Sequence, residues 1–116
     1  MIFRIELPLP MPANNAYPTN WKTKRRYLCK RAREWKVEAG WLIVAAWPPK
    51  FLGDYTFQIL VPEKMRGDAD GRIKLPQDLL VELGITPDDQ KAKESRATRD
   101  SSVAWGKCVV IVESVQ

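Results

Sequence analysis

The chain has 116 residues, 45% of them hydrophobic, and carries 19 Lys or Arg against 14 Asp or Glu, a formal net charge of +5. This composition excludes a disordered chain, fits a single domain over residues 1–116, and favours an acidic partner, with nucleic acid before a membrane surface. The sequence contains no His, which excludes Ser-His-Asp and Cys-His catalysis and zinc sites of the Cys-His type. An enzyme of this sequence must therefore work with carboxylates, Lys or metal-bound water.

The first half of the chain predicts a strand, a loop and a long helix. Residues 2–7 alternate between apolar and charged side chains, as a half-buried strand does. Residues 7–20 hold four Pro and three Asn and predict a loop. Apolar residues then recur at three- and four-residue spacing from about 24 to 46, which predicts a helix that ends at a Pro-Pro pair. The predicted apolar stripe consists of Leu28, Ala32, Trp35, Ala39, Leu42 and Ala46.

The second half of the chain predicts three strands and one short helix. Residues 55–61 alternate as a strand does, and residues 75–84 predict a helix between a Pro and a Gly. Strands are predicted at 91–98 and at 107–114. The helix core face consists of Leu79, Leu80 and Leu83. The order strand, helix, strand, helix, strand, strand predicts a two-layer α+β fold, with helices packed on a mixed sheet.

The cellular setting is predicted from the cysteines and from the apolar runs. Cys29 and Cys108 are far apart in the sequence and are predicted to be free thiols in a reducing cytoplasm. The longest apolar run, residues 40–47, is far shorter than the about 20 residues that span a bilayer. The N-terminus has no charged-then-apolar signal pattern.

An acidic motif, GDADGRIK at 67–74, suggests metal chemistry. Asp68 and Asp70 are two residues apart, so in an extended or turning chain both can reach one hard cation such as Mg²⁺. Asp88 or Asp89, after the short helix, can supply a third oxygen ligand, and Lys74 can reach a phosphate. Carboxylates, a metal ion and a Lys together perform phosphodiester hydrolysis. The alternative is that DADG and PDDQ are ordinary turn sequences.

A basic segment at 22–36 predicts contact with nucleic acid. It holds eight bases against one acid, Glu34, and the aromatic residues Tyr17, Trp21 and Tyr27 lie beside or among them. Lys and Arg follow phosphates, and exposed aromatic side chains stack on unpaired bases. Trp35 belongs to the core stripe instead. The alternative is that this segment is a solvated helix face.

The joint spacing of these motifs resembles the RusA family of Holliday-junction resolvases. That family has an Asp-x-Asp-Asn sequence, a Lys four residues after the second Asp, and an Asp-Asp pair after an intervening helix. Here Lys74 lies six residues and Asp89 twenty-one residues after Asp68. The opening LPLPMPANNAY is also similar to the family's first strand and Pro-rich loop, so the resemblance covers about residues 3 to 113. Gly71 stands where the family has Asn.

The resemblance implies a homodimer that binds four-way DNA junctions and nicks two opposed strands symmetrically in DNA recombination and repair. It implies Mg²⁺ as the cofactor, with Mn²⁺ as a possible substitute. Asp68, Asp70 and Asp89 would bind the metal, and Lys74 would act on the scissile phosphate. The residues expected to contact DNA are Lys22, Lys24, Arg25, Arg26, Lys30, Arg31, Arg66 and Arg72. The alternative is a catalytically degenerate DNA-binding module or a phage accessory protein.

Overall fold

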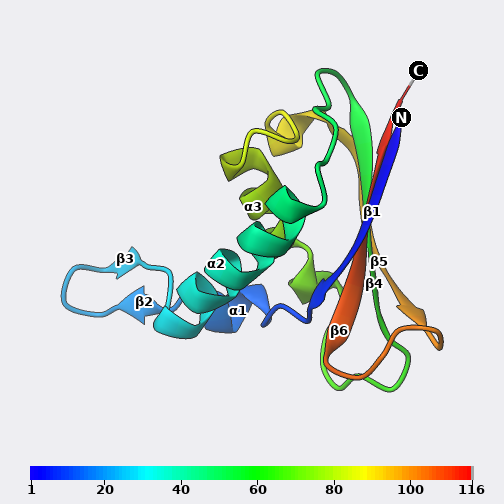
Figure 1. The fold of residues 1–116 in the computed structure, drawn as a ribbon. Coiled ribbons are helices and arrows are strands. Elements are labelled where there is room, and N and C mark those ends of the chain that lie inside the picture. The colour runs from blue at the N-terminus through cyan, green and yellow to red at the C-terminus, as the bar shows by residue number, and fades with distance from the viewer. Residues whose placement is uncertain (116) are drawn as a thin grey trace.

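The computed structural model describes residues 1–115 and has two layers, a four-stranded sheet and a group of helices on one of its faces (Figure 1). The strands are β1 (Ile2–Pro8), β4 (Tyr55–Pro62), β5 (Ala92–Asp100) and β6 (Lys107–Ser114). Their order across the sheet is β1-β6-β4-β5. Strand β6 is antiparallel to β1 and β4, whereas β5 is parallel to β4. The predicted α+β fold with a mixed sheet is therefore confirmed.

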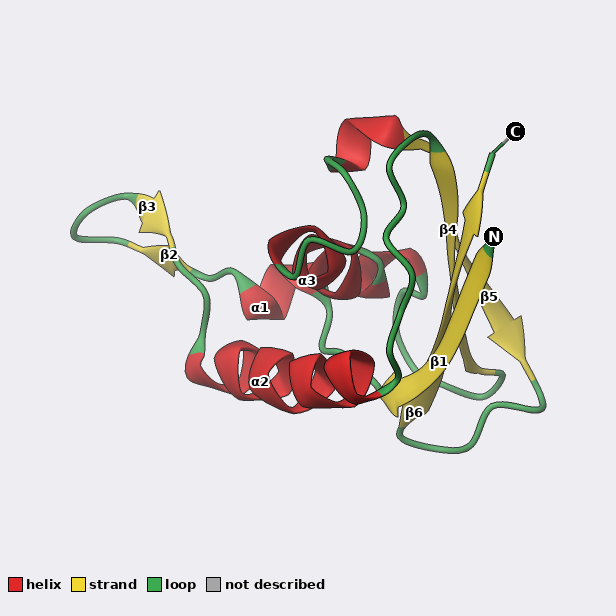
Figure 2. Cartoon of the chain, turned by 45° about the horizontal axis from the view of Figure 1, so that its top comes forward, coloured by secondary structure: helices red, strands yellow, loops and turns green. Residues whose placement is uncertain are grey.

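The helical layer contains two main helices that lie side by side (Figure 2). The helices are α1 (Ala13–Ala16), α2 (Lys30–Ala45) and α3 (Lys74–Glu82), and two single 3-10 turns are η1 (Asp70–Arg72) and η2 (Asp89–Lys91). The connection from β4 to its parallel neighbour β5 runs through η1, α3 and η2. Among residues 1–115, no helix has both the length and the apolar character that crossing a lipid bilayer requires.

One main hydrophobic cluster joins the sheet to the helices. Alternate residues of β4 point into this cluster, as the two-residue period of a strand requires: Tyr55, Phe57, Ile59 and Val61. The buried residues of α2 that face them are Ala32, Trp35, Ala39 and Ile43. Trp35 also donates a hydrogen bond from Nε1 to the Pro8 carbonyl oxygen over 2.8 Å, which ties α2 to the end of β1.

The helix predicted at 24–46 is wrong at its N-terminal end, because α2 begins at Lys30 and residues 19–26 form a hairpin. Strand β2 (Thr19–Asn20) pairs with β3 (Arg25–Arg26). The Asn20 side-chain oxygen accepts hydrogen bonds from the backbone N–H of Lys22 (3.0 Å) and of Thr23 (3.4 Å). Lys24 has a left-handed φ of 57°. The Asn side chain thus bonds the backbone locally and stabilises a turn in place of the helix.

The predicted core faces of both helices are each wrong by a residue or two. Leu42 in α2 and Ala46 directly after it are exposed, and Ile43, four residues after Ala39, takes the buried position. After α3, Leu83 is exposed because the helix ends at Glu82. The loop predicted at 7–20 also contains one short helix, α1. Apolar spacing of three or four residues fits both Leu42 and Ile43 as the buried residue. The packing of α2 on the sheet determines which of the two is buried.

Candidate active site

The loop that leads to the acidic motif is held by Arg99, a residue that the sequence did not single out. Arg99 on β5 donates hydrogen bonds to the carbonyl oxygens of Met65 and Gly67, the second over 2.7 Å. Gly67 has a φ of 91°, a conformation that suits glycine, and the chain turns there into Asp68. Arg99 acts on backbone carbonyls more than thirty residues away, and no local sequence pattern reveals such a contact.

Asp68 and Asp70 lie together on this exposed loop. One carboxylate oxygen of Asp68 accepts a hydrogen bond from the backbone N–H of Asp70 over 3.0 Å. This is the bond of an ordinary Asp turn, which is the alternative interpretation of the motif. A Cβ built on Gly71 would lie 3.7 Å from the Pro12 side chain and 3.8 Å from Asp68 Oδ2. The Pro-rich loop therefore packs directly beside the acidic motif, as its position after β1 allows.

Lys74 is the first residue of α3, and two neighbouring side chains hold it. Its Nζ lies 3.1 Å from Asp78 Oδ2 and 5.3 Å from the centre of the Tyr17 ring. The Tyr17 hydroxyl donates a hydrogen bond to the same Asp78 oxygen over 2.9 Å. Pro76 falls in the first helical turn, where its missing N–H has no helical partner, so Lys74 keeps its place at the helix start. Asp78 was not predicted, although its spacing of four from Lys74 is the signal of a helical ion pair.

Asp88 and Asp89 follow α3 in the turn before β5. Asp88 caps η2 by accepting a hydrogen bond from the backbone N–H of Gln90 over 3.2 Å. A hydrogen bond between the two carboxyl groups raises the pKa of Asp89 and lowers the pKa of Asp88. The charge of Asp78 raises the pKa of Asp89 further, whereas Lys74 lowers it. Asp89 is therefore electrostatically coupled to the Lys74–Asp78 pair.

The same acids line a shallow pocket of about 300 Å³ beside α3. Its lining residues are Asp78, Val81, Glu82, Asp88 and Asp89. Two of these four carboxylates already pair with a Lys, Asp78 with Lys74 and Glu82 with Lys36, which reduces the negative charge that a further cation would meet. Two of these four, Asp78 and Glu82, lie on the face of α3 that the sequence analysis did not consider.

The predicted ligands suit Mg²⁺ by their chemistry, since all three are carboxylates. The fold brings the turn that carries Asp70 and the turn that carries Asp89 into contact with the same helix, α3. Within residues 1–115, however, no group of three or more His, Cys, Asp or Glu side chains is placed to hold one metal ion. A shared magnesium site of Asp68, Asp70 and Asp89 therefore stays a prediction.

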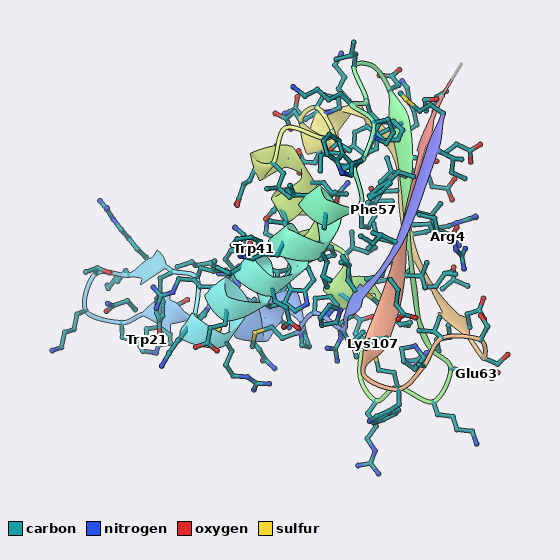
Figure 3. All side chains as sticks on the ribbon, viewed as in Figure 1. Arg4, Trp21, Trp41, Phe57, Glu63 and Lys107 are labelled. Carbon is teal, nitrogen blue, oxygen red and sulfur yellow. The ribbon has the colours of Figure 1, made fainter. Side chains whose placement is uncertain are left out.

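The Lys and Arg residues predicted to contact DNA fall into two groups, and the larger group includes those of the hairpin. We call residues 19–26 the arm; Figure 3 shows it projecting beyond the helices, with Trp21 on it. Its four bases are exposed, as are Lys30 and Arg31 at the start of α2. Lys30 lies 3.9 Å from Glu34 in an exposed ion pair. The exposed arm bases are Lys22, Lys24, Arg25 and Arg26. From residue 7 to residue 33 the chain contains no Asp or Glu, so the arm itself carries only positive charges.

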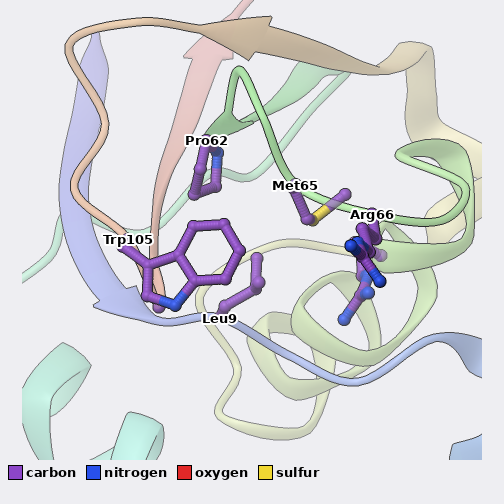
Figure 4. A pocket seen from close by; sticks show the side chains of 7 residues that line it. Leu9, Pro62, Met65, Arg66 and Trp105 are labelled. Carbon is purple, nitrogen blue, oxygen red and sulfur yellow. The ribbon is translucent and has the colours of Figure 1, made fainter.

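The second group, Arg66 and Arg72, lines a pocket of about 570 Å³ together with Trp105 (Figure 4). Arg66 is exposed, but Arg72 is half-buried and donates a hydrogen bond from Nη1 to the Pro10 carbonyl oxygen over 2.6 Å. Burial lowers the pKa of Arg72, and its buried Nε has no hydrogen-bond partner among residues 1–115. Arg72 thus holds the Pro-rich loop against the motif, and a role for it in DNA contact stays a prediction.

Tyr17 gives a pH-dependent test of its own contact with Asp78 on α3. Burial, reinforced by the hydrogen bond to Asp78, raises the pKa of Tyr17 from 10.0 to about 12. The folded state therefore binds this proton more tightly than the unfolded state does. Stability from this group is fully present below about pH 10 and is lost as the pH rises to about 12. We expect Tyr17→Phe to reduce the fall in the free energy of unfolding over this range, measured by urea titration at several pH values. An unchanged pH dependence would contradict the contact.

Comparisons with known proteins give no match, since neither a protein-family model nor a curated protein sequence matches the chain. The resemblance to the RusA family therefore rests on the spacing of the Asp and Lys motifs in this sequence. The function must be inferred from the residues around Lys74 and from the basic arm beside them.

Proposed function

We propose that this chain is a magnesium-dependent endonuclease that resolves four-way (Holliday) DNA junctions by paired symmetric nicks. The observation that supports this most is the surroundings of Lys74. This Lys begins α3 and contacts Asp78 and Tyr17, with Asp70 in the turn before the helix and Asp89 in the turn after it. The proposed setting is DNA recombination and repair in the cytoplasm of a bacterial or phage-infected cell.

In this proposal the carboxylates and Lys74 have different roles. Asp68, Asp70 and Asp89 would hold Mg²⁺, or Mn²⁺ in its place, which when bound offsets negative charge on the reacting phosphate and lowers the pKa of water. Lys74 contributes a positive charge beside these acids, and its ion pair with Asp78 over 3.1 Å keeps the ammonium at the start of α3. When DNA enters, a phosphate oxygen replaces Asp78 as the partner of Lys74.

The separation of charges supports DNA as the substrate. Acids gather around α3, while the arm and the start of α2 carry bases without any acid between residues 7 and 33. A polyanion is then attracted to the arm without neutralising the acids that a cation needs. The residues proposed to contact phosphates are Lys22, Lys24, Arg25, Arg26, Lys30, Arg31, Arg66 and Arg72.

The proposal is tested by incubating the purified chain with a synthetic four-way junction and Mg²⁺, beside a linear duplex of the same sequence. Two symmetric cuts in the junction and none in the duplex are expected. A second function, a DNA-binding module without activity, is favoured by the lack of three converging acids among residues 1–115. Junction binding without cutting in any divalent metal would establish that alternative. Absent or salt-insensitive DNA binding would instead favour a phage accessory protein, because phosphate contacts weaken as salt rises.

A homodimer is part of the proposal, and an exposed apolar groove supports it. The groove is lined by Lys36, Val37, Gly40, Trp41, Val44 and Leu83, and Trp41 is 76% exposed (Figure 3). One exposed aromatic side chain can bury about 200 Å² on association. With the neighbouring Val and Leu side chains, this face supplies much of the about 800 Å² per partner that a stable interface needs. Two copies pairing α2 against α2 would cover both faces at once.

We therefore expect Trp41→Glu to shift the protein from dimers to monomers, because it places a charge in the centre of the interface. Sedimentation velocity at several concentrations measures the shift. Trp105→Glu is the matched control, since Trp105 is 75% exposed and lines a different pocket. Dimers that persist in Trp41→Glu, or a wild-type chain that is monomeric throughout, would exclude this face as the interface.

A further inference from the structure

We propose that Trp21 on the arm stacks on the unstacked face of a base at the branch point of the DNA, so that the arm recognises branched DNA. This inference rests on the proposed function, because it names the feature of the same DNA that the arm recognises. It concerns binding alone and needs neither the metal nor the cleavage step.

The first argument is the exposure of Trp21 far from the core. Its side chain is 84% exposed, and every residue from 21 to 27 is exposed. The arm is paired at only two positions, Thr19 with Arg26 and Asn20 with Arg25, and it extends away from the sheet beyond the helices (Figure 1). Trp21 therefore does little for folding, while its indole is available to a partner.

The second argument is the charge that surrounds the indole. The four basic residues of the arm all follow Trp21, at positions 22 to 26, and no acid lies within a dozen residues on either side of Trp21. An acid-free basic segment attracts a polyanion, and an aromatic side chain among cations is the combination that binds single-stranded nucleic acid by stacking. A fully paired duplex offers this indole no free base face, whereas an open branch point does.

The third argument is that the arm is tied to the candidate active site at its root. The Arg26 Nε donates a hydrogen bond to the Tyr17 carbonyl oxygen over 2.9 Å, and the Tyr27 N–H donates one to the Pro18 carbonyl over 3.0 Å. The hydroxyl of the same Tyr17 bonds Asp78 over 2.9 Å, beside Lys74. Tyr17 thus connects the arm to α3. A base held by Trp21 consequently sets which phosphate of the branched DNA lies near Lys74.

The experiment measures binding of the full chain in a chelator, so that no DNA is cut. The probes are a four-way junction with the fluorescent base 2-aminopurine at its branch point and a linear duplex of matched sequence. The wild-type chain should bind the junction more tightly and quench the 2-aminopurine. Trp21→Ala should bind the junction about 5- to 150-fold more weakly, the effect of losing one base stack, with little change on the duplex and no quenching. Trp21→Phe should retain part of both effects.

Two controls make the result specific. Trp47→Ala removes an even more exposed indole, 91% exposed, from the loop that follows α2 and should behave as wild type. Lys22→Gln should weaken binding to junction and duplex alike and lower the salt slope by about 1. Circular dichroism and melting temperature should be unchanged in Trp21→Ala, since the arm lies outside the core.

Three results would overturn the inference. They are junction binding by Trp21→Ala equal to that of Trp47→Ala, an equal loss on junction and duplex, and the absence of DNA binding by the wild-type chain. Failure of the nuclease proposal is separate: a chain that quenches the branch-point base through Trp21 but never cuts in Mg²⁺ would retain this inference and lose the enzyme.

Discussion

Phe57→Ala is expected to lower the free energy of unfolding by about 3–5 kcal/mol, the cost of a large cavity in a packed core. Phe57 is 1% exposed and lies on the central strand β4, opposite Val112 of β6 and Ser95 of β5. Neighbours on both sides prevent the strand from collapsing into the space that the ring leaves. The melting temperature should fall by roughly 10–20 °C, and urea titration should give the free energy directly.

Leu52→Ala is the control for this prediction, because Leu52 is 89% exposed in the loop before β4. It should change the free energy of unfolding by less than about 0.5 kcal/mol. A cost below about 1 kcal/mol for Phe57→Ala would mean that the sheet and the helical layer do not pack on one another around this ring.

Asp70→Asn is expected to reduce junction cleavage by at least about 10²- to 10³-fold, the usual loss when one group that stabilises the transition state is removed. The substitution keeps the shape of the side chain and removes its negative charge. Junction binding in a chelator should persist or strengthen slightly, because one charge that repels DNA is gone. Gel assays of cutting, with binding measured separately, distinguish the two effects.

The same variant tests magnesium binding without cleavage. Mg²⁺ that binds only the folded chain raises its stability, by about 2.7 kcal/mol at a concentration 100 times the dissociation constant. Asp70→Asn should lose most of this increase in melting temperature. Asp54→Asn is a suitable control, since Asp54 pairs with Lys93 over 3.3 Å in an exposed ion pair. A wild-type chain whose melting temperature does not change in saturating Mg²⁺ would count against the metal site.

The strands were the most predictable part of the fold. The strand predicted at 107–114 has the same bounds in the structure, and β1 differs from its prediction by one residue. Where apolar and polar residues alternate, as in β1, the period of two identifies both the strand and its buried face. The start of α2 was predicted too early because Leu28, four residues before Ala32, continues the apolar spacing of the helix although it lies before Lys30. Before Lys30 the chain makes the β2–β3 hairpin, with the Asn20 side chain bonded to its own turn and the Cys29 N–H donating to the Ala16 carbonyl oxygen.

Only those site residues were predictable that lie close together in the sequence and form a short motif. The acids and Lys74 follow from short motifs, and the structure places Lys74 at a helix start as expected. Arg99 and Tyr17 act through partners 32 or more residues away in the chain. No spacing rule links such residues, because the fold alone brings them together.

The two edges of the sheet carry a consequence for aggregation. The outer strands are β1 and β5, and both present charged side chains to solvent: Arg4 and Glu6 on one, and Lys93, Glu94 and Arg96 on the other. Charges on an exposed edge hinder the addition of a strand from another molecule. The apolar centre of the sheet, β4 and β6, is thereby kept from seeding fibrils, and concentrated preparations should resist amyloid-like growth unless the edge strands detach.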